Sequence, residues 1–191
     1  MQSADKLQSA LRGPITTLFT LETERLLLRE LSTADARFIL RLLNEPSFLH
    51  FIGDKGVRNL DDARSYILTG PVDSYERHGF GLYCVQLKST GTPIGICGLL
   101  KRESLADVDV GFAFLPEFWN KGYAFESGAS ILLYGKDVLK LPRIVAITNK
   151  DNNASAKLLD KLGLHFDRLI TMPGETHEIR LFTTKDYNHE T

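Results

Sequence analysis

The order of strand-like and helix-like patterns limits the fold of this chain more than any other feature. Short apolar runs predict strands, and apolar positions at three- and four-residue spacing predict helices. Helical segments follow the first, fourth and fifth strands. This order is typical of an α/β (α+β) fold: a mixed, mostly antiparallel sheet of about seven strands flanked by helices. The predicted strands are Thr23–Leu31, Gly81–Lys88, Pro93–Lys101, Asp107–Leu115, Arg143–Asn149, Leu164–Ile170 and Glu178–Thr183.

Start and stop residues mark the helices between these strands. Ser32–Asp35 resembles a capping box, and Asn59 begins a second helix in the same way. Gly70 and Pro71 break or kink the second helix, because proline lacks the N–H that a helix interior needs. Two later helices are predicted at Tyr123–Leu139 and Asn153–Leu162, the last one stopped by Gly163.

The length of the chain favours one domain. Its 191 residues match a single domain of ordinary size. Hydrophobic residues make up 43% and charged residues 25%, as in an average soluble globular protein. We expect residues 19–185 to form the domain, and residues 1–18 to be an N-terminal extension with a short helix over Ala4–Leu11.

The charge balance and hydropathy exclude several classes of partner. The formal net charge is −1, whereas a nucleic-acid-binding surface is usually strongly basic. No apolar stretch approaches the 18 residues of a membrane span, and the first 20 residues lack a signal-peptide pattern. We therefore expect a cytoplasmic protein that binds neither nucleic acid nor membrane.

Cys84 and Cys97 lie on two strands of one predicted hairpin. A turn centred between Thr90 and Gly91 would place them opposite each other. One hypothesis is a redox pair. The other, which a cytoplasmic protein favours, is two reduced and buried side chains.

The segment Leu115–Glu126 carries the strongest signal for a ligand. A strand ends, a loop with Gly122 follows, and the longest predicted helix begins. A helix N-terminus has unpaired N–H groups and the positive end of the helix dipole, and small Ala124 leaves room for close approach. The segment is either a cradle for a pyrophosphate or an ordinary strand-to-helix turn.

Other site motifs are absent from the sequence. There is no P-loop pattern, and the GxG that begins at Gly79 has Cys84 where the dinucleotide fingerprint requires glycine. The five histidines show no metal-ligand spacing, so no metal is predicted.

The same segment resembles motif A of the GNAT family of N-acetyltransferases, whose pattern is Gln/Arg-x-x-Gly-x-Gly/Ala. Gly122 and Ala124 occupy the small positions, while Trp119 replaces Gln/Arg, as is usual in the RimJ/RimL-like branch. Weaker matches follow in the order of the family over residues 20–183. They include Thr23–Leu26, Pro93–Gly95, Cys97–Leu99, Asp109–Phe112, Thr148–Asn149, Asn152, Ser155 and Lys161–Gly163.

The resemblance implies acetyl-CoA as cosubstrate and no metal. It also implies that the fourth and fifth strands splay apart, with pantetheine in the gap and the pyrophosphate on the loop before the long helix. Lys121 would add charge there, or simply lie in solvent. The implied cofactor-binding residues are Phe112, Ala113, Phe114, Leu115, Trp119, Asn120, Lys121, Gly122, Tyr123, Ala124, Asn149, Asn152 and Ser155.

The resemblance also suggests catalytic residues. Asp109 would guide or deprotonate the amine through water, or else be a strand-surface carboxylate; Glu103 and Asp107 are alternatives. Leu159 stands where many relatives carry a tyrosine acid. Ser155 is its substitute, with Asn152 positioning it or bonding pantetheine, although both residues are also good helix caps.

The implied function is transfer of acetyl to a primary amine, with a protein N-terminal α-amine favoured by the RimJ/RimL likeness. The alternatives are a small amine (polyamine, amino acid or antibiotic), a catalytically weak acyl-CoA-binding regulatory module, and a nucleotide-binding protein. The oligomeric state stays open between monomer and homodimer. The acceptor groove would include aromatic residues that could equally be core: Phe48, His50, Phe51, Tyr75, Phe80 and Tyr83.

Overall fold

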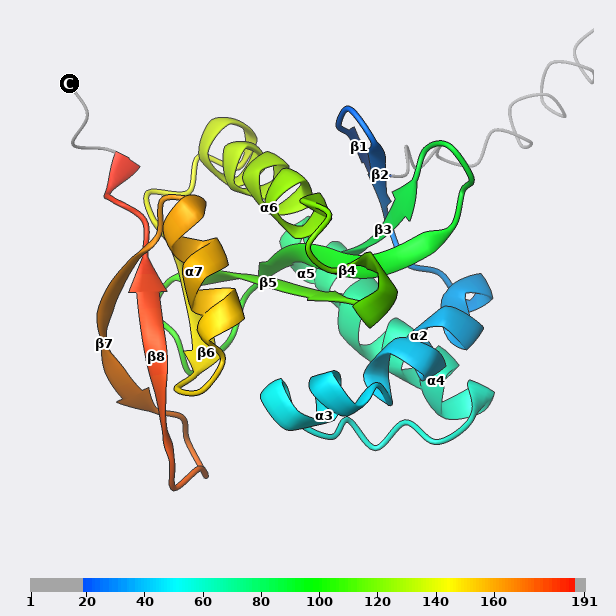
Figure 1. Ribbon diagram of the computed structural model, residues 1–191, viewed down its shortest axis with the longest axis horizontal. Helices are drawn as coiled ribbons and strands as arrows, with labels where there is room; N and C mark the ends of the chain where they lie inside the picture. The colour runs from blue at the N-terminus through cyan, green and yellow to red at the C-terminus, as the bar shows by residue number, and fades with distance from the viewer. Residues whose placement is uncertain (1–18, 188–191) are drawn as a thin grey trace, which may run out of the picture.

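An eight-stranded sheet runs through the molecule in the computed structural model, which describes residues 19–187 (Figure 1). The strand order is β1-β2-β3-β4-β5-β6-β8-β7, and only β5 and β6 pair in parallel. The predicted mixed, mostly antiparallel sheet is therefore confirmed. The strands are β1 (Thr20–Glu22), β2 (Leu26–Arg29), β3 (Leu82–Leu87), β4 (Pro93–Leu100), β5 (Val108–Phe114), β6 (Ile144–Asn149), β7 (His165–Thr171) and β8 (Glu178–Thr183).

The eighth strand arises from a turn at the start of the described chain. The prediction had one strand over Thr23–Leu31, but the Thr23 N–H donates to the Leu26 carbonyl at 3.0 Å. This turn folds β1 back onto β2 as an edge strand. The predicted helix over Ala4–Leu11 lies outside the described residues.

Six α-helices cover the described sheet. Asn59 caps α4 as predicted, accepting hydrogen bonds from the N–H groups of Asp61 and Asp62. Pro71 does not end that helical region but is accommodated in a π-helical turn, Leu68–Val72. A second π turn, Tyr134–Val138, extends α6. The helices are α2 (Ala36–Leu43), α3 (Pro46–Phe51), α4 (Leu60–Ile67), α5 (Asp73–His78), α6 (Tyr123–Leu133) and α7 (Asn153–Lys161).

The sheet is buried on both faces. One face packs under α6 and α7, where Leu99, Val110 and Ile131 belong to one core cluster. The opposite face packs against α2 and α4, with Ile39, Ala63 and Ile96 in a second cluster. Helices on both faces explain why β4 is apolar along most of its length.

The two cysteines do not face each other as predicted. Tyr83 pairs with Cys97 and Cys84 pairs with Ile96, because the turn is centred earlier than predicted: the Leu87 N–H donates to the Thr92 carbonyl, and the bulge between Val85 and Gln86 corrects the register only in part. A shift of one residue sends the two side chains to opposite faces of the sheet. Both thiols are free and buried, and burial raises the pKa of each to about 12. The hypothesis of two buried, reduced cysteines is confirmed, and the redox pair was wrong.

Strands β5 and β6 pair only at their beginnings. The ladder has two steps, Val108 with Ile144 and Asp109 with Val145, and β6 then continues alongside β8. An ion pair between Asp107 and Arg143, at 2.7 Å, joins the two segments that lead into β5 and β6. Beyond it the strands diverge, which confirms the predicted splay. We call the two-step ladder the vertex of the gap.

Candidate functional site

The gap between β5 and β6 is lined by backbone groups. The Leu115 N–H donates to the Ile94 carbonyl at 3.0 Å, so odd-numbered residues of β5 bond to β4. In an antiparallel ladder the alternate residues point the other way. The N–H and C=O groups of Phe112 and Phe114 therefore face the gap, whereas those of Ala113 are bonded to β4.

Trp119 closes one of these positions. Its indole N–H donates to the Phe114 carbonyl at 2.7 Å, and its ring stays half-exposed. The indole thereby holds the short 3₁₀ turn Pro116–Phe118 against the end of β5. Of the predicted pantetheine partners, the Phe112 amide and carbonyl and the Phe114 N–H remain open to a ligand.

The loop into α6 contains two left-handed residues. Asn120 has φ of 58° and Gly122 has φ of 82°. Gly122 is the N-cap residue of α6, and no side chain in the described part of the chain caps this end. The first N–H groups of a helix have no partner within it, so those of Tyr123 and Ala124 are available to an anion. Lys121 is exposed, with its ammonium 5.5 Å from the centre of the Phe118 ring.

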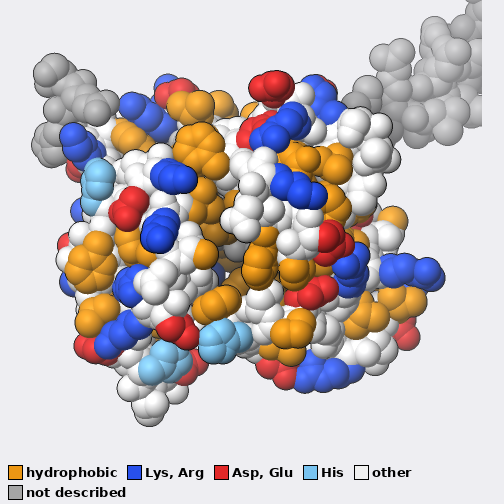
Figure 2. All heavy atoms as spheres, viewed as in Figure 1, with side chains coloured by type: hydrophobic (Ala, Val, Ile, Leu, Met, Phe, Trp, Pro, Cys, Tyr) orange, Lys and Arg blue, Asp and Glu red, His pale blue; other side chains and the backbone are white. Residues whose placement is uncertain are grey.

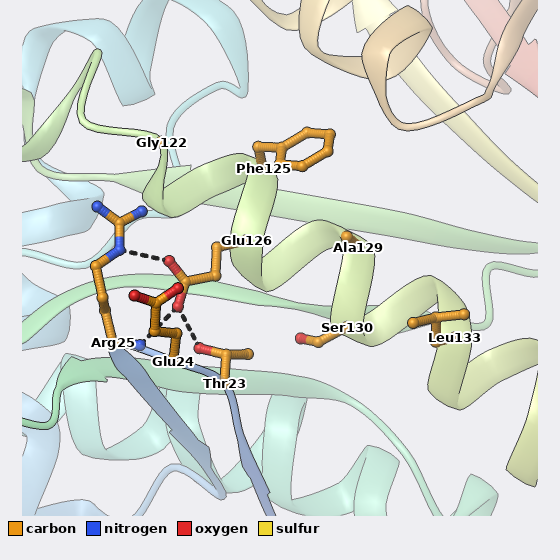
Figure 3. Close-up of a pocket in the computed structure, with 9 residues that line it drawn as sticks. All are labelled: Thr23, Glu24, Arg25, Gly122, Phe125, Glu126, Ala129, Ser130 and Leu133. Atoms are coloured by element: carbon orange, nitrogen blue, oxygen red, sulfur yellow. Dashed lines mark hydrogen bonds and ion pairs between the residues drawn. The ribbon is translucent and has the colours of Figure 1, made fainter.

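Arg25 and Glu126 brace this loop, a role that sequence reasoning missed. The Arg25 side chain donates to the Glu126 carboxylate at 2.7 Å (Figure 3). It also donates to the Lys121 carbonyl at 3.0 Å. Its guanidinium also lies 4.6 Å from the centre of the Tyr123 ring. Glu126 also accepts from Thr23 at 2.5 Å; burial opposes its charge, but these hydrogen bonds hold its pKa below the usual value. The match at Thr23–Leu26 was the available signal.

Asn152 and Ser155 lie at the start of α7. The Asn152 side-chain oxygen accepts from the Ser155 N–H at 3.0 Å, so the capping role is confirmed. Within the described residues the Ser155 hydroxyl has no hydrogen-bond partner, and Ser155 is partly exposed. Leu159, one turn later, is buried in the core.

Asn149 ends β6 and reaches α3. Its side-chain N–H groups donate to the carbonyls of Phe51 at 3.2 Å and of His50 at 3.4 Å. His50 also pairs with Asp151 at 3.0 Å. These contacts hold α3 against the β6 side of the gap, and the Asn149 side-chain nitrogen is therefore bonded to α3. Figure 2 shows a hollow with hydrophobic side chains in the middle of the face that is turned to the viewer.

Asp109 lies at the vertex and is 1% exposed. Both of its carboxylate oxygens accept from the Arg102 Nε at 3.1 Å. Burial nevertheless raises the pKa of Asp109. The alternative of a solvent-facing carboxylate was wrong, because Asp109 is covered by Arg102. Asp107 is paired with Arg143, and Glu103 is exposed on the β4–β5 loop.

Most of the aromatic residues predicted near the acceptor are core. Phe48, Phe80 and Tyr83 are each at most 7% exposed. Tyr75 accepts from the Leu31 N–H and donates to the Leu82 carbonyl. His50 is exposed.

Residues 19–187 contain no cluster of three or more His, Cys, Asp or Glu side chains arranged for a metal ion. None of their helices has the length and hydropathy to span a membrane.

Comparison with known proteins identifies the family. Residues 25–165 match the family model described as "Acetyltransferase (GNAT) domain". The uncharacterized N-acetyltransferase YoaA of Bacillus subtilis is 31% identical over 145 residues, covering 75% of this chain and 81% of YoaA. An acetyltransferase crystal structure from Agrobacterium tumefaciens has a TM-score of 0.75 at 23% identity, covering 90% of this chain and 97% of the other.

A structure of RimL, a ribosomal alpha-N-protein acetyltransferase, in complex with coenzyme A also shares the fold. Its TM-score is 0.69 at 13% identity, covering 86% of this chain and 97% of RimL. The family match, the diverging strands and the open helix N-terminus agree, and the chain belongs to the GNAT family of N-acetyltransferases.

Proposed function

We propose that this enzyme transfers acetyl from acetyl-CoA to a primary amine, and that residues 19–185 form the catalytic unit. The observation that carries the proposal is the gap between β5 and β6, which runs from the vertex to the N-terminus of α6. The RimJ/RimL likeness supports a protein N-terminal α-amine as the acceptor.

The donor would lie along β5. Pantetheine amides would pair with the free backbone groups of Phe112 and Phe114, and the pyrophosphate with the N–H groups that follow Gly122. Asn149 and Asn152 each use one half of the amide side chain within the protein. The Asn149 oxygen and the Asn152 nitrogen remain for the cosubstrate.

Acetyl transfer needs a neutral amine, donors for the oxyanion and a proton for the departing thiolate. An α-amine with a pKa of about 7.7–8.0 is neutral in roughly a tenth of molecules at pH 7, so it needs little help from a base. N–H groups of β5 that face the gap would stabilise the oxyanion. The Ser155 hydroxyl would donate to the thiolate.

Asp109 would guide the amine indirectly. It cannot touch an acceptor in this structure, because Arg102 covers both carboxylate oxygens. Its influence on the acceptor would pass through Arg102.

A second candidate is a weakly catalytic acyl-CoA-binding module, which the buried Leu159 in place of a tyrosine acid favours. Calorimetry with coenzyme A, followed by thiol release from acetyl-CoA with tetrapeptides, amino acids and spermidine, separates the two. Thiol release with at least one amine supports the enzyme. Coenzyme A binding without turnover supports the module, and absence of binding rejects both.

A further inference from the structure

We propose that Arg102 binds an anionic group of the acceptor, so that the preferred acceptor is a primary amine carrying a carboxylate. This inference rests on the proposed acetyl transfer and defines the chemical class of its acceptor.

The position of Arg102 follows from the geometry of the gap. A donor whose phosphates lie at the N-terminus of α6 extends along β5 towards the vertex. From Phe114 to Asp109 the strand rises roughly 17 Å. Asp109 is a vertex residue, and Arg102 is bonded to it. Arg102 therefore stands where the donor would end.

Asp109 holds only one edge of the Arg102 guanidinium. Both oxygens of the buried carboxylate bond to Nε. Within the described residues, the terminal nitrogens Nη1 and Nη2 of Arg102 have no hydrogen-bond partner, and the side chain is 38% exposed. A guanidinium presents its donors in a planar fork that matches a carboxylate. The arrangement is an arginine fixed from beneath with its remaining donors free.

The charge of Arg102 also acts on two other side chains. Lys55 is an exposed residue on the loop between α3 and α4; loss of surrounding water lowers its pKa first, and the charge of Arg102 lowers it further. Tyr66 on α4 is partly buried, and burial raises the pKa of its hydroxyl while the charge of Arg102 opposes that rise. The positive charge of Arg102 therefore acts beyond the Asp109 carboxylate that holds it.

The free donors of the Arg102 guanidinium beside the acyl end select among amines. A protonated polyamine offers no acceptor for these donors, whereas a carboxylate near the reacting amine would accept hydrogen bonds from them. The carboxylate could belong to a free amino acid or to an acidic side chain near a peptide N-terminus. Both sources present the same group to Arg102.

The test uses matched acceptors that differ only in charge. One pair is L-serine and L-serinamide, and the other is the amidated peptides Ser-Glu-Ala-Ala and Ser-Gln-Ala-Ala; spermidine is a cationic reference. The measurements are kcat/KM from thiol release and calorimetric binding to the protein saturated with coenzyme A. We expect the wild-type protein to favour the carboxylate member of at least one pair by about tenfold or more. The pair in which the carboxylate member is preferred shows whether the carboxylate belongs to a free amino acid or to an acidic side chain near a peptide N-terminus.

The variants R102Q and R102Q/D109N are expected to lower that preference to within about twofold; the double variant avoids leaving a buried carboxylate unpaired. R77Q, which changes an exposed arginine paired with Asp73 on α5, is expected to keep the preference. Equal binding of both members by the wild-type protein, or an unchanged preference in folded R102Q/D109N, would overturn the anion site. If no amine is acetylated but binding of the carboxylate member is preferred and lost in R102Q/D109N, the anion site is supported and the proposed enzyme activity fails.

Discussion

The two ends of the gap between β5 and β6 present different kinds of chemical group to a ligand. At the α6 end, the groups open to a ligand are main-chain N–H and C=O groups, arranged by Gly122 and by strand alternation. At the vertex they are side chains, with Arg102 bonded to the buried Asp109. A main-chain site tolerates many side chains and suits a constant donor. A side-chain site changes with single substitutions and suits the acceptor that distinguishes one enzyme from another.

The largest effect is expected at the main-chain end. Gly122→Glu places a side chain at φ of 82°, where its Cβ meets Arg25 Nη2 at 3.2 Å, and it adds negative charge to the proposed pyrophosphate site. We expect the Kd for coenzyme A to rise about 100-fold or more, as measured by calorimetry. Gly174→Glu is the control, because Gly174 has φ of 83° but nothing within 4 Å of its Cβ. Equal losses of coenzyme A affinity in the two variants would show that the loop at Gly122 does not bind the pyrophosphate.

Ser155→Ala tests the chemistry between the two ends. Among residues 19–187 the hydroxyl has no hydrogen-bond partner to lose, so the fold is expected to be unchanged. We expect kcat to fall about 100-fold while the Kd for coenzyme A stays within about twofold. Steady-state kinetics with calorimetry measures both, and an unchanged kcat would show that Ser155 is not the acid.

The buried charge at the vertex predicts a pH-dependent stability. Since the folded-state pKa of Asp109 is raised above its ordinary value of 3.8, the folded protein binds the proton more tightly. The contribution of Asp109 to stability therefore falls as pH rises from about 3.8 to the folded-state pKa. Each pKa unit of that interval corresponds to about 1.4 kcal/mol.

Asp109→Asn cannot titrate, so urea unfolding of both proteins across this range measures the effect. We expect the free energy of unfolding of D109N to gain on that of the wild-type protein as pH rises. If the difference in free energy of unfolding stays constant with pH, burial does not raise the pKa of Asp109.

The smallest effect is expected for the cap of α7. Asn152→Ala removes the hydrogen bond from the Ser155 N–H, which costs about 1 kcal/mol of stability. Chemical denaturation measures this loss. Asn152→Asp keeps the acceptor and should keep the stability, while losing the side-chain nitrogen proposed to contact pantetheine. If the N152D variant binds coenzyme A as tightly as the wild-type protein does, that contact is absent.

Local patterns explain which parts of the fold were predictable. A helix cap and an apolar run each depend on residues that lie close together in the sequence. The cap before α4 and the apolar run of β6 are of this kind, and both elements form where predicted. The turn at Thr23 was missed because the hydrogen bond that splits β1 from β2 leaves little trace in the hydropathy pattern. Pro71 was expected to break or kink a helix, but a wider π turn absorbs it.

The candidate site shows the same division. Gly122 and the start of α6 lie in one short segment, so the sequence alone determined that this chain has an open helix N-terminus after a strand. Only the tertiary structure decided that Arg25 braces Glu126, that Asn149 holds α3 and that Arg102 covers Asp109. The first two contacts join residues about a hundred positions apart. The third depends on the pairing of β4 with β5, where a slip of one residue would turn Asp109 to the other face of the sheet.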